Sequence, residues 1–276
     1  MVTLAKSKFY VTTPIYYVND VPHIGHAYTT VAADTLARWH RSLGKDVFFL
    51  TGTDEHGLKI QRAAEAAGKK PQKFVDGVSS RFKDVFKKLN ISYDKFIRTT
   101  DEEHLECVKA LINKVNETGD IYKGIYEGKY CVDCENYLSQ DDIVDNKCKI
   151  HNKPVEYLKE ESYFFNLFKY QKKLLKLYEQ NPKLILPAGR QHEIVSKIKK
   201  ELLDLSITRT SFDWGVPFPL DKKHITYVWF DALANYISAS DFARLKRRRP
   251  TSALSNSRAT LQSDLHCPRI AVSRLS

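Results

Sequence analysis

Segments of strand character alternate with segments of helical periodicity along the first 119 residues, and this alternation restricts the fold more than any other feature. Residues 9–13 are rich in β-formers, and a helical pattern then runs from about Gly25 to Gly44. The apolar run at 47–50 is typical of a strand buried on both faces of a parallel sheet. Further elements are expected as helices ending at Gly68, over 71–89 and from 100 to 119, and a strand at 96–98. Thr100-Asp-Glu-Glu103 is expected to form a capping box at the start of the last of these helices. The order predicts an α/β fold with a doubly wound, parallel (Rossmann-type) sheet.

The composition indicates a folded chain and excludes several classes of protein. Of 276 residues, 42% are hydrophobic, which is enough for a core. No apolar run approaches the roughly 20 residues of a membrane helix, and the N-terminus lacks the apolar segment of a signal peptide. We therefore expect a cytoplasmic protein with no membrane partner. The net charge of +11 fits a nucleic-acid partner and fits a mildly basic surface equally well.

The amino-acid composition and the periodicity of the sequence change after residue 119. Residues 120–151 are rich in Tyr, Gly, Cys, Asp and Lys and lack helical periodicity, whereas helices are expected at about 163–180 and 188–204. Strand character returns at 225–231, and we expect this strand to rejoin the first sheet. The predicted organisation has four parts: the first half of a nucleotide-binding domain at 1–119, a connective insertion at 120–224, a return strand and helix start at 225–240, and a tail at 241–276.

The tail differs from the rest in its basic residues. Residues 241–276 contain one Lys, seven Arg and six Ser, whereas the preceding chain prefers Lys to Arg. A reading-frame change near Ser240 explains this switch, and a genuine basic Ser/Arg tail is the alternative. In both cases the segment is expected to be disordered and dispensable for the fold.

A His-Ile-Gly-His string lies between the first strand and the first helix. A helix N-terminus offers free N–H groups and a positive dipole end, which suit a phosphate. Gly25 lets a nucleotide approach the backbone, and His23 and His26 can both face one phosphate and stabilise charge on it. Taken alone, two structural histidines would explain the string, but its position after the first strand favours phosphate binding.

Four potential metal ligands form two pairs, and the two members of each pair are separated by two residues. Such a pair can bend round one metal ion and is called a knuckle here. Cys131-x-x-Cys134 is followed thirteen residues later by Cys148-x-x-His151. Two such pairs complete a tetrahedral Cys₃His zinc site, and four protein ligands make it structural rather than catalytic. Five cysteines in a chain of this kind do not indicate a disulfide framework.

Two further segments are candidate parts of a site. Gly52-Thr-Asp-Glu-His-Gly57 follows the buried strand, where open α/β sheets place their ligands. Asp54 there can pair with a substrate ammonium, while His56 and Gly57 can face a nucleotide; a plain polar loop is the alternative. The second segment, Tyr227–Tyr236, offers an apolar wall beside Ala232, although an aromatic core is the usual meaning of such a run.

These pieces, in this order, resemble class I aminoacyl-tRNA synthetases and, within them, the methionyl-tRNA synthetase family. The resemblance is carried over roughly residues 8–238 by the segments TTPIYYVNDVPHIGHAYTTVAAD, FLTGTDEHGLKI, CVDCENYLSQDDIV, SITRTSFDWGVPFP and ITYVWFDALANY. The similar isoleucyl, valyl and leucyl enzymes are far longer and carry an editing insert. Cysteinyl enzymes place zinc in the amino-acid pocket.

The resemblance implies a reaction and a role for each matching residue. Methionine attacks ATP to give methionyl-adenylate, and the methionyl group then passes to tRNA(Met), with Mg²⁺ on the phosphates and one structural Zn²⁺. His23 and His26 would act on ATP, and Tyr17 and Asp54 would contact methionine, Asp54 taking its ammonium. The thioether pocket would be lined by Val228, Ala232, Leu233 and Tyr236.

The resemblance ends near Ser240. Beyond it we find neither the rest of the catalytic domain with its lysine-rich KMSKS loop nor an anticodon-binding domain. The expectation is therefore an incomplete domain with little methionine activation of its own. Two other functions stay open: a catalytically inactive, zinc-stabilised remnant, and a small nucleotidylyltransferase with an HxGH motif, which would not explain the zinc ligands.

Overall fold

The computed structural model describes residues 7–134, 136–138, 140–200 and 202–239. A parallel sheet forms its first part, and β3 (Asp46–Asp54) is the central strand. β1 (Lys8–Thr12) and β2 (Tyr16–Tyr17) pair with successive parts of β3 on one side, and β4 (Lys95–Arg98) pairs with it on the other. All these pairings are parallel. The predicted α/β class with a parallel sheet is confirmed.

The helices of this part are α1 (Ile24–Ser42), α2 (Leu58–Ala66), α3 (Pro71–Lys88) and α4 (Glu102–Glu117). α1 ends where predicted, and Gly44 adopts a φ of +75°, the left-handed conformation that terminates many helices. Phe49 and Leu50 of β3 are fully buried, as a central strand requires. A Cβ at Gly52 would overlap the carbonyl oxygen of Ile97, so only glycine permits β4 to pair here.

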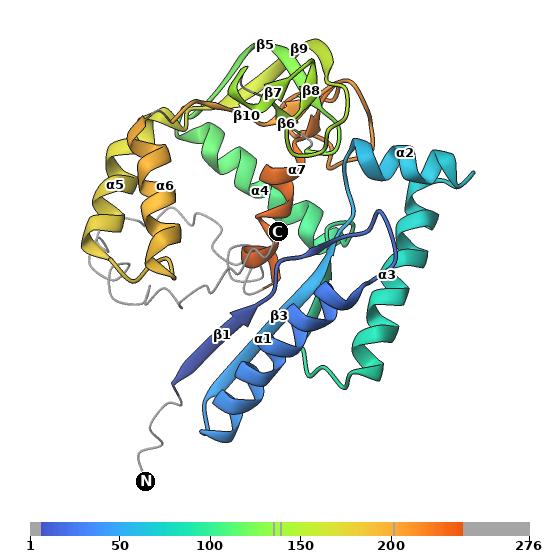
Figure 1. Ribbon diagram of the computed structural model, residues 1–276, viewed down its shortest axis with the longest axis vertical. Helices are drawn as coiled ribbons and strands as arrows, with labels where there is room; N and C mark the ends of the chain where they lie inside the picture. Colours follow the sequence, from blue (N-terminus) through green and yellow to red (C-terminus); the bar gives the residue numbers. More distant parts are fainter. Residues whose placement is uncertain (1–6, 135, 139, 201, 240–276) are drawn as a thin grey trace, which may run out of the picture.

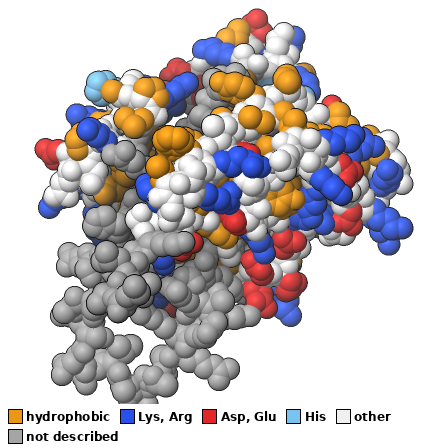
Figure 2. All heavy atoms as spheres, turned by 90° about the horizontal axis from the view of Figure 1, so that it is seen from below, with side chains coloured by type: hydrophobic (Ala, Val, Ile, Leu, Met, Phe, Trp, Pro, Cys, Tyr) orange, Lys and Arg blue, Asp and Glu red, His pale blue; other side chains and the backbone are white. Residues whose placement is uncertain are grey.

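α1 exposes the side chains that revealed its periodicity. Tyr28, Val31, Leu36 and Trp39 are 43–65% exposed, and the buried face consists of Thr30, Ala33, Asp34 and Ala37. Small residues face the sheet because they let the helix lie close to it. Hydrophobic side chains also reach the surface in several groups among lysines and arginines in Figure 2. The apolar spacing thus predicts the helix correctly without identifying its buried face.

The expected insertion, residues 120–224, contains a long antiparallel ribbon that the sequence did not suggest. β5 (Ile121–Cys131) pairs with β9 (Glu156–Phe165) over ten residue pairs. β6 (Asn136–Tyr137) and β10 (Leu205–Ser206) extend this sheet, and β7 (Ile143–Val144) and β8 (Lys147–Cys148) form a small hairpin. Two 3-10 turns lie at Gln140–Asp142 and Phe168–Tyr170. In Figure 1 the ribbon stands at the opposite end of the molecule from β1 and α1.

The two expected helices of the insertion exist with shorter bounds. α5 (Gln171–Gln180) and α6 (Ala188–Lys200) pack side by side as a helical hairpin (Figure 1). Residues 163–165, expected to start the first helix, end strand β9 instead, because they pair with Ile121–Lys123 of β5. Residues 202–204 also fall outside the second helix.

The expected return strand is the clearest correction. β12 (Ile225–Thr226) has two residues and pairs antiparallel with β11 (Thr208–Arg209), not with the first sheet. The chain then turns into α7 (Val228–Ala232), which lies between the ribbon and the parallel sheet in Figure 1. Arg209 is 1% exposed and its guanidinium lies 4.1 Å from the centre of the Tyr227 ring. This stacked pair fixes the two short strands together, so the segment is buried without joining the sheet.

Within the described ranges, no helix is both long enough and apolar enough to cross a membrane. The expectations for residues 241–276 lie outside the described residues. The four-part division of the chain stays a prediction.

Candidate functional site

The two histidines of the HIGH string cap α1 reciprocally. The His23 Nδ1 accepts a hydrogen bond from the Gly25 N–H at 3.1 Å, and the His26 Nδ1 accepts one from the His23 N–H at 3.1 Å. The ring centroids are 3.7 Å apart. A Cβ on Gly25 would lie only 3.0 Å from the His23 ring, so this glycine gives the ring its room.

The caps fix where each ring carries its proton. Since both Nδ1 atoms accept backbone hydrogen bonds, the proton of each neutral ring lies on Nε2. Burial, with a smaller contribution from the neighbouring His23, lowers the pKa of His26 to about 4. His26 is therefore neutral near pH 7 and offers an N–H donor rather than a positive charge.

The His26 pKa makes the stability of the protein depend on pH. Its folded value of about 4 lies below the ordinary 6.5, so the unfolded chain binds more protons between these values. The contribution of His26 is complete above pH 6.5 and is lost as the pH falls towards 4. We expect the His26 ring signals to titrate near pH 4 in an NMR titration. His26→Gln keeps a side-chain acceptor at this helix position, and its unfolding free energy should fall less between pH 6.5 and 4. An equal fall in both proteins would contradict this assignment.

The candidate methionine contacts are neighbours in the sheet. Tyr17 of β2 is the register partner of Asp54, the last residue of β3. Asp54 is 8% exposed, and the Tyr17 hydroxyl donates to the His56 carbonyl at 3.3 Å. The preceding residue, Tyr16, places its ring 4.8 Å from that of His26. One short strand therefore connects the Asp54 end of the sheet with the capped start of α1.

Glu55 forms a buried ionic network that the sequence analysis missed. Its carboxylate is fully buried and accepts two hydrogen bonds from Arg98, at 2.7 and 2.8 Å. Thr53 and Thr100 donate their hydroxyls to the same carboxylate, each at 2.6 Å. The predicted capping box at Thr100 is therefore wrong: the hydroxyl is used by Glu55, and Asp101 caps α4 by position without a side-chain bond. A pair of opposite charges 43 residues apart gives no local signal.

His56 points away from the surface and bonds to a carboxylate of α7. The His56 Nδ1 lies 2.7 Å from an Asp231 oxygen, and the His104 Nε2 of α4 lies 2.7 Å from the other. His56 is 4% exposed, and its neighbour Gly57 adopts a φ of +116° as it starts α2. Such a φ favours glycine. Asp231 and His104 were not among the predicted site residues.

The residues expected to line a thioether pocket differ in exposure. Val228 and Ala232 are 6% and 4% exposed, and the backbone carbonyl of Tyr236 accepts a hydrogen bond from the Tyr10 hydroxyl of β1 at 3.2 Å. Leu233 is 56% exposed and belongs to a different stripe, spaced by four residues, with Trp229 and Ile237. A ligand can reach this exposed stripe. The spacing of four residues in the sequence is the signal that would have added Trp229 to the candidate site residues.

The four knuckle residues come together in the structure. The Cys134 Sγ lies 3.6 Å from the Cys148 Sγ and 3.3 Å from the His151 Nδ1. The His151 Nδ1 lies 3.8 Å from the sulfurs of both Cys131 and Cys148. All four donor atoms lie within 4.8 Å of one another. Tetrahedral zinc with sulfur and nitrogen ligands requires separations of about 3.6–3.8 Å, so the cluster fits this ion.

A tight hairpin places the second knuckle. Asp145 and Asn146 adopt φ values of 49° and 61° between β7 and β8, as a two-residue hairpin turn requires. Cys148 lies two residues after Asn146 and is 1% exposed. The apolar neighbours of this cluster are few: Val155, Leu138 and Ile143. Hydrophobic burial by so small a core contributes little to holding the segment together.

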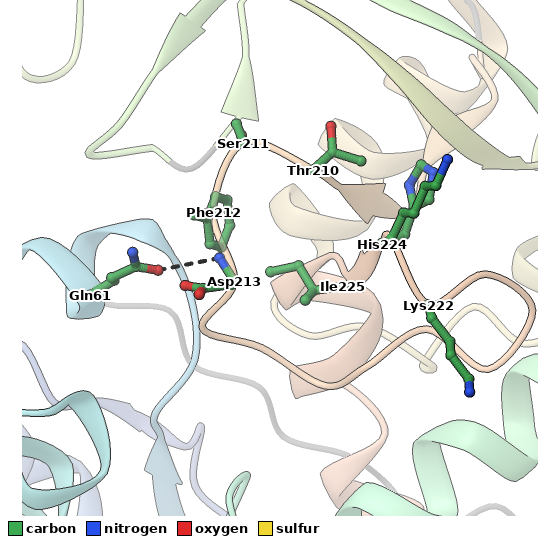
Figure 3. A pocket seen from close by; sticks show the side chains of 9 residues that line it. Gln61, Thr210, Ser211, Phe212, Asp213, Lys222, His224 and Ile225 are labelled. Atoms are coloured by element: carbon green, nitrogen blue, oxygen red, sulfur yellow. Dashed lines mark hydrogen bonds between the residues drawn. The ribbon is translucent and has the colours of Figure 1, made fainter.

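A hollow of about 430 Å³ lies outside these groups. It is bounded by Gln61 of α2 and by residues 210–213 and 222–225 (Figure 3). The Gln61 side chain accepts a hydrogen bond from the Asp213 N–H at 3.4 Å across its rim. None of the site residues predicted from the sequence lines this hollow.

The chain matches the family model described as "tRNA synthetases class I (M)" over residues 9–143 and 134–253. The chain belongs to this family. Relatives include the methionine–tRNA ligase of Caldanaerobacter subterraneus subsp. tengcongensis, 54% identical over 234 residues that cover 85% of this chain and 37% of that protein. The methionine–tRNA ligase of Thermotoga maritima is 52% identical over 84% of this chain and 38% of that protein.

Solved structures of class I (M) synthetases agree with the fold. Mycobacterium tuberculosis methionyl-tRNA synthetase in complex with methionyl-adenylate superimposes with a TM-score of 0.83 at 44% identity, covering 86% of this chain and 47% of that one. The apo form of the same enzyme gives a TM-score of 0.73 at 40% identity, over 89% of this chain and 48% of that one. This chain thus spans less than half the length of the relatives it matches.

Proposed function

We propose that this chain is the methionine- and ATP-binding part of a methionine–tRNA ligase. The proposal depends on one observation: Tyr16 and Tyr17, adjacent on β2, contact His26 and pair with Asp54, respectively. A buried carboxylate and two N–H-donating imidazoles therefore lie at the same end of the parallel sheet. A carboxylate suits the ammonium of an amino acid, and the donors suit phosphate, so the two substrates of adenylate formation can meet there.

The proposed chemistry is transfer of an adenylyl group. A carboxylate oxygen of methionine bonds to the α-phosphorus of ATP, and the bond to the β-phosphate bridging oxygen breaks, releasing pyrophosphate. The methionyl group would then pass to tRNA(Met). His23 and His26 would donate from Nε2 to phosphate oxygens, stabilising the charge that develops there, and Gly25 and Gly57 would lie along the nucleotide. The His56 side chain, expected from the sequence to face the nucleotide, is buried against Asp231 instead and takes no part in holding ATP.

The remaining candidate residues are assigned to methionine and to zinc. Asp54 would take the methionine ammonium beside Tyr17. The apolar wall would be formed by α7, with its buried Val228 and Ala232, and by Leu233 and Tyr236 of the segment that follows it. Cys131, Cys134, Cys148 and His151 would hold one Zn²⁺, which closes the knuckles into a rigid unit. Mg²⁺ would accompany the triphosphate. Because the ligase reaction serves translation, we place the protein in the cytoplasm.

Methionine binding is the most direct test, because it depends on residues that the structure describes. In isothermal titration calorimetry, methionine should bind and leucine should not. Asp54→Asn should weaken methionine binding about 10- to 100-fold, as loss of a charge-assisted hydrogen bond predicts, and should leave ATP binding unchanged. Asp46→Asn, at the exposed start of the same strand, is the matched control. Equal methionine affinity in the Asp54 and Asp46 variants would contradict the assignment.

A further inference from the structure

A buried carboxylate joins three elements that are far apart in the sequence. Asp231 of α7 bonds to His56 after β3 and to His104 of α4, each at 2.7 Å, and the His104 Nδ1 lies 2.9 Å from the Ser238 hydroxyl. We call these four residues the Asp231 clasp. Asp231 and His104 are fully buried, and His56 and Ser238 are 4% and 3% exposed. The clasp is thus closed off from solvent.

The hydrogen bonds define the proton positions in the clasp. A carboxylate only accepts, so His56 donates from Nδ1 and His104 from Nε2. The second nitrogen of a neutral His104 then accepts from the Ser238 O–H at 2.9 Å, a shorter contact than that of the same hydroxyl with the Asn235 carbonyl at 3.3 Å. Burial acts to raise the pKa of Asp231, but the two imidazoles outweigh it and bring the pKa below its ordinary value. The carboxylate is therefore ionised, with both of its oxygens paired.

The clasp connects the two places where methionine would be held. His56 lies two residues after Asp54, the proposed ammonium contact, and Asp231 precedes Ala232 in the helix proposed for the side chain. We propose that Asp231 is a positioning residue for methionine binding, because its bond to His56 fixes the distance between the ammonium site and the apolar wall. This inference rests on the proposed function of the chain.

An asparagine at position 231 cannot reproduce this arrangement. Its amide presents one oxygen and one NH₂ group, so one of the two ring N–H donors would face another donor. The ring concerned must turn or change tautomer, and the loop at Asp54–Gly57 and α7 lose their fixed separation. Methionine spans both places and should lose affinity, whereas ATP, bound at the start of α1, should not.

The test compares Asp231→Asn with Asp221→Asn. Asp221 lies 3.8 Å from the His224 Nε2 and is 22% exposed, so it is a carboxylate beside a histidine outside the clasp. In calorimetry we expect Asp231→Asn to weaken methionine binding at least about tenfold, the usual effect of a lost hydrogen bond to a charged group. ATP affinity should stay within twofold. Ser238→Ala, a milder change, should act in the same direction and serves if Asp231→Asn does not fold.

Nitrogen-15 spectra of the imidazoles supply a readout that a merely structural role would not produce. In the unaltered chain, His56 should be protonated on Nδ1 and His104 on Nε2, and Asp231→Asn should change at least one of these tautomers. Other tautomers in the unaltered chain, unchanged methionine affinity, or equal loss of methionine and ATP binding would each overturn the inference.

A failure of the proposed function is recognised separately. If the unaltered chain binds no methionine, that function is wrong, and hydrogen exchange then decides whether the clasp couples the two places. Faster exchange of the Gly57 and Phe230 amides together, in Asp231→Asn but not in Asp221→Asn, would support the coupling. Unchanged exchange at both amides would refute it.

Discussion

An Arg98→Met variant is expected to lose about 3–5 kcal/mol of unfolding free energy, the usual cost of leaving one member of a buried ion pair alone. Glu55 is fully buried, and Arg98 supplies both of its charged hydrogen bonds. Methionine keeps the volume of the arginine stem but offers no donor, so the Glu55 carboxylate would be charged without a counter-ion. Chemical denaturation followed by circular dichroism measures the loss.

Two further variants identify the cause of that loss. Arg62→Met removes a similar side chain from an ion pair with Glu156, whose members are 49% and 45% exposed at 3.3 Å; such a surface pair contributes about 1 kcal/mol or less. Glu55→Gln combined with Arg98→Met removes the buried charge and should recover part of the lost stability. The contrary result is that Glu55→Gln lowers the unfolding free energy as much in the Arg98→Met variant as it does in the unaltered chain. In that case the unpaired charge would not be the cause of the loss.

Cys131→Ala should abolish binding of one equivalent of zinc. The four ligand atoms of the cluster lie within 4.8 Å of one another, and in zinc-finger peptides the ion contributes about 10–16 kcal/mol through such a site. The variant should loosen residues 131–155 locally, since their apolar core is small, while the parallel sheet stays folded. Hydrogen exchange, read region by region, separates these two outcomes.

Metal analysis by mass spectrometry decides the zinc assignment itself. Cys107→Ala is the matched control, because Cys107 is also buried, at 3% exposure, but lies on α4 outside the cluster. It should retain the zinc content of the unaltered chain. Unchanged zinc in the Cys131 variant would eliminate the knuckle assignment.

Local signals in the sequence predicted the parts of the molecule that depend on neighbours along the chain. The end of α1 at Gly44, the buried β3 and the ligand quartet all follow from short-range spacing, and the structure contains each of them. The β5–β9 ribbon was missed because its side chains alternate only weakly between exposed and buried. The two strands, β5 and β9, are separated in the sequence by the segment that carries the metal ligands, so no short-range pattern connects them.

The candidate site was predicted only in part for a related reason. Sequence motifs indicated His23, His26 and Asp54, whose positions depend on one strand and one helix start. Asp231 and Arg98 were missed as partners of His56 and Glu55, because a buried charge finds its counterpart through the tertiary fold. The return strand was wrong because Ile225–Thr226 pair with Thr208–Arg209 of β11 instead of the parallel sheet, and Arg209 also stacks on the neighbouring Tyr227.

The distance along the chain between the clasp residues has a consequence for folding during synthesis. His56 and Asp231 are 175 residues apart, and at about 5–20 residues per second a ribosome needs roughly 10–35 s to make the intervening chain. During that interval β1, β3 and α1 can already associate, but the His56 loop has no partner for its buried nitrogen. We therefore expect the nascent sheet to form early and the substrate end of it to acquire its final shape last, when α7 emerges.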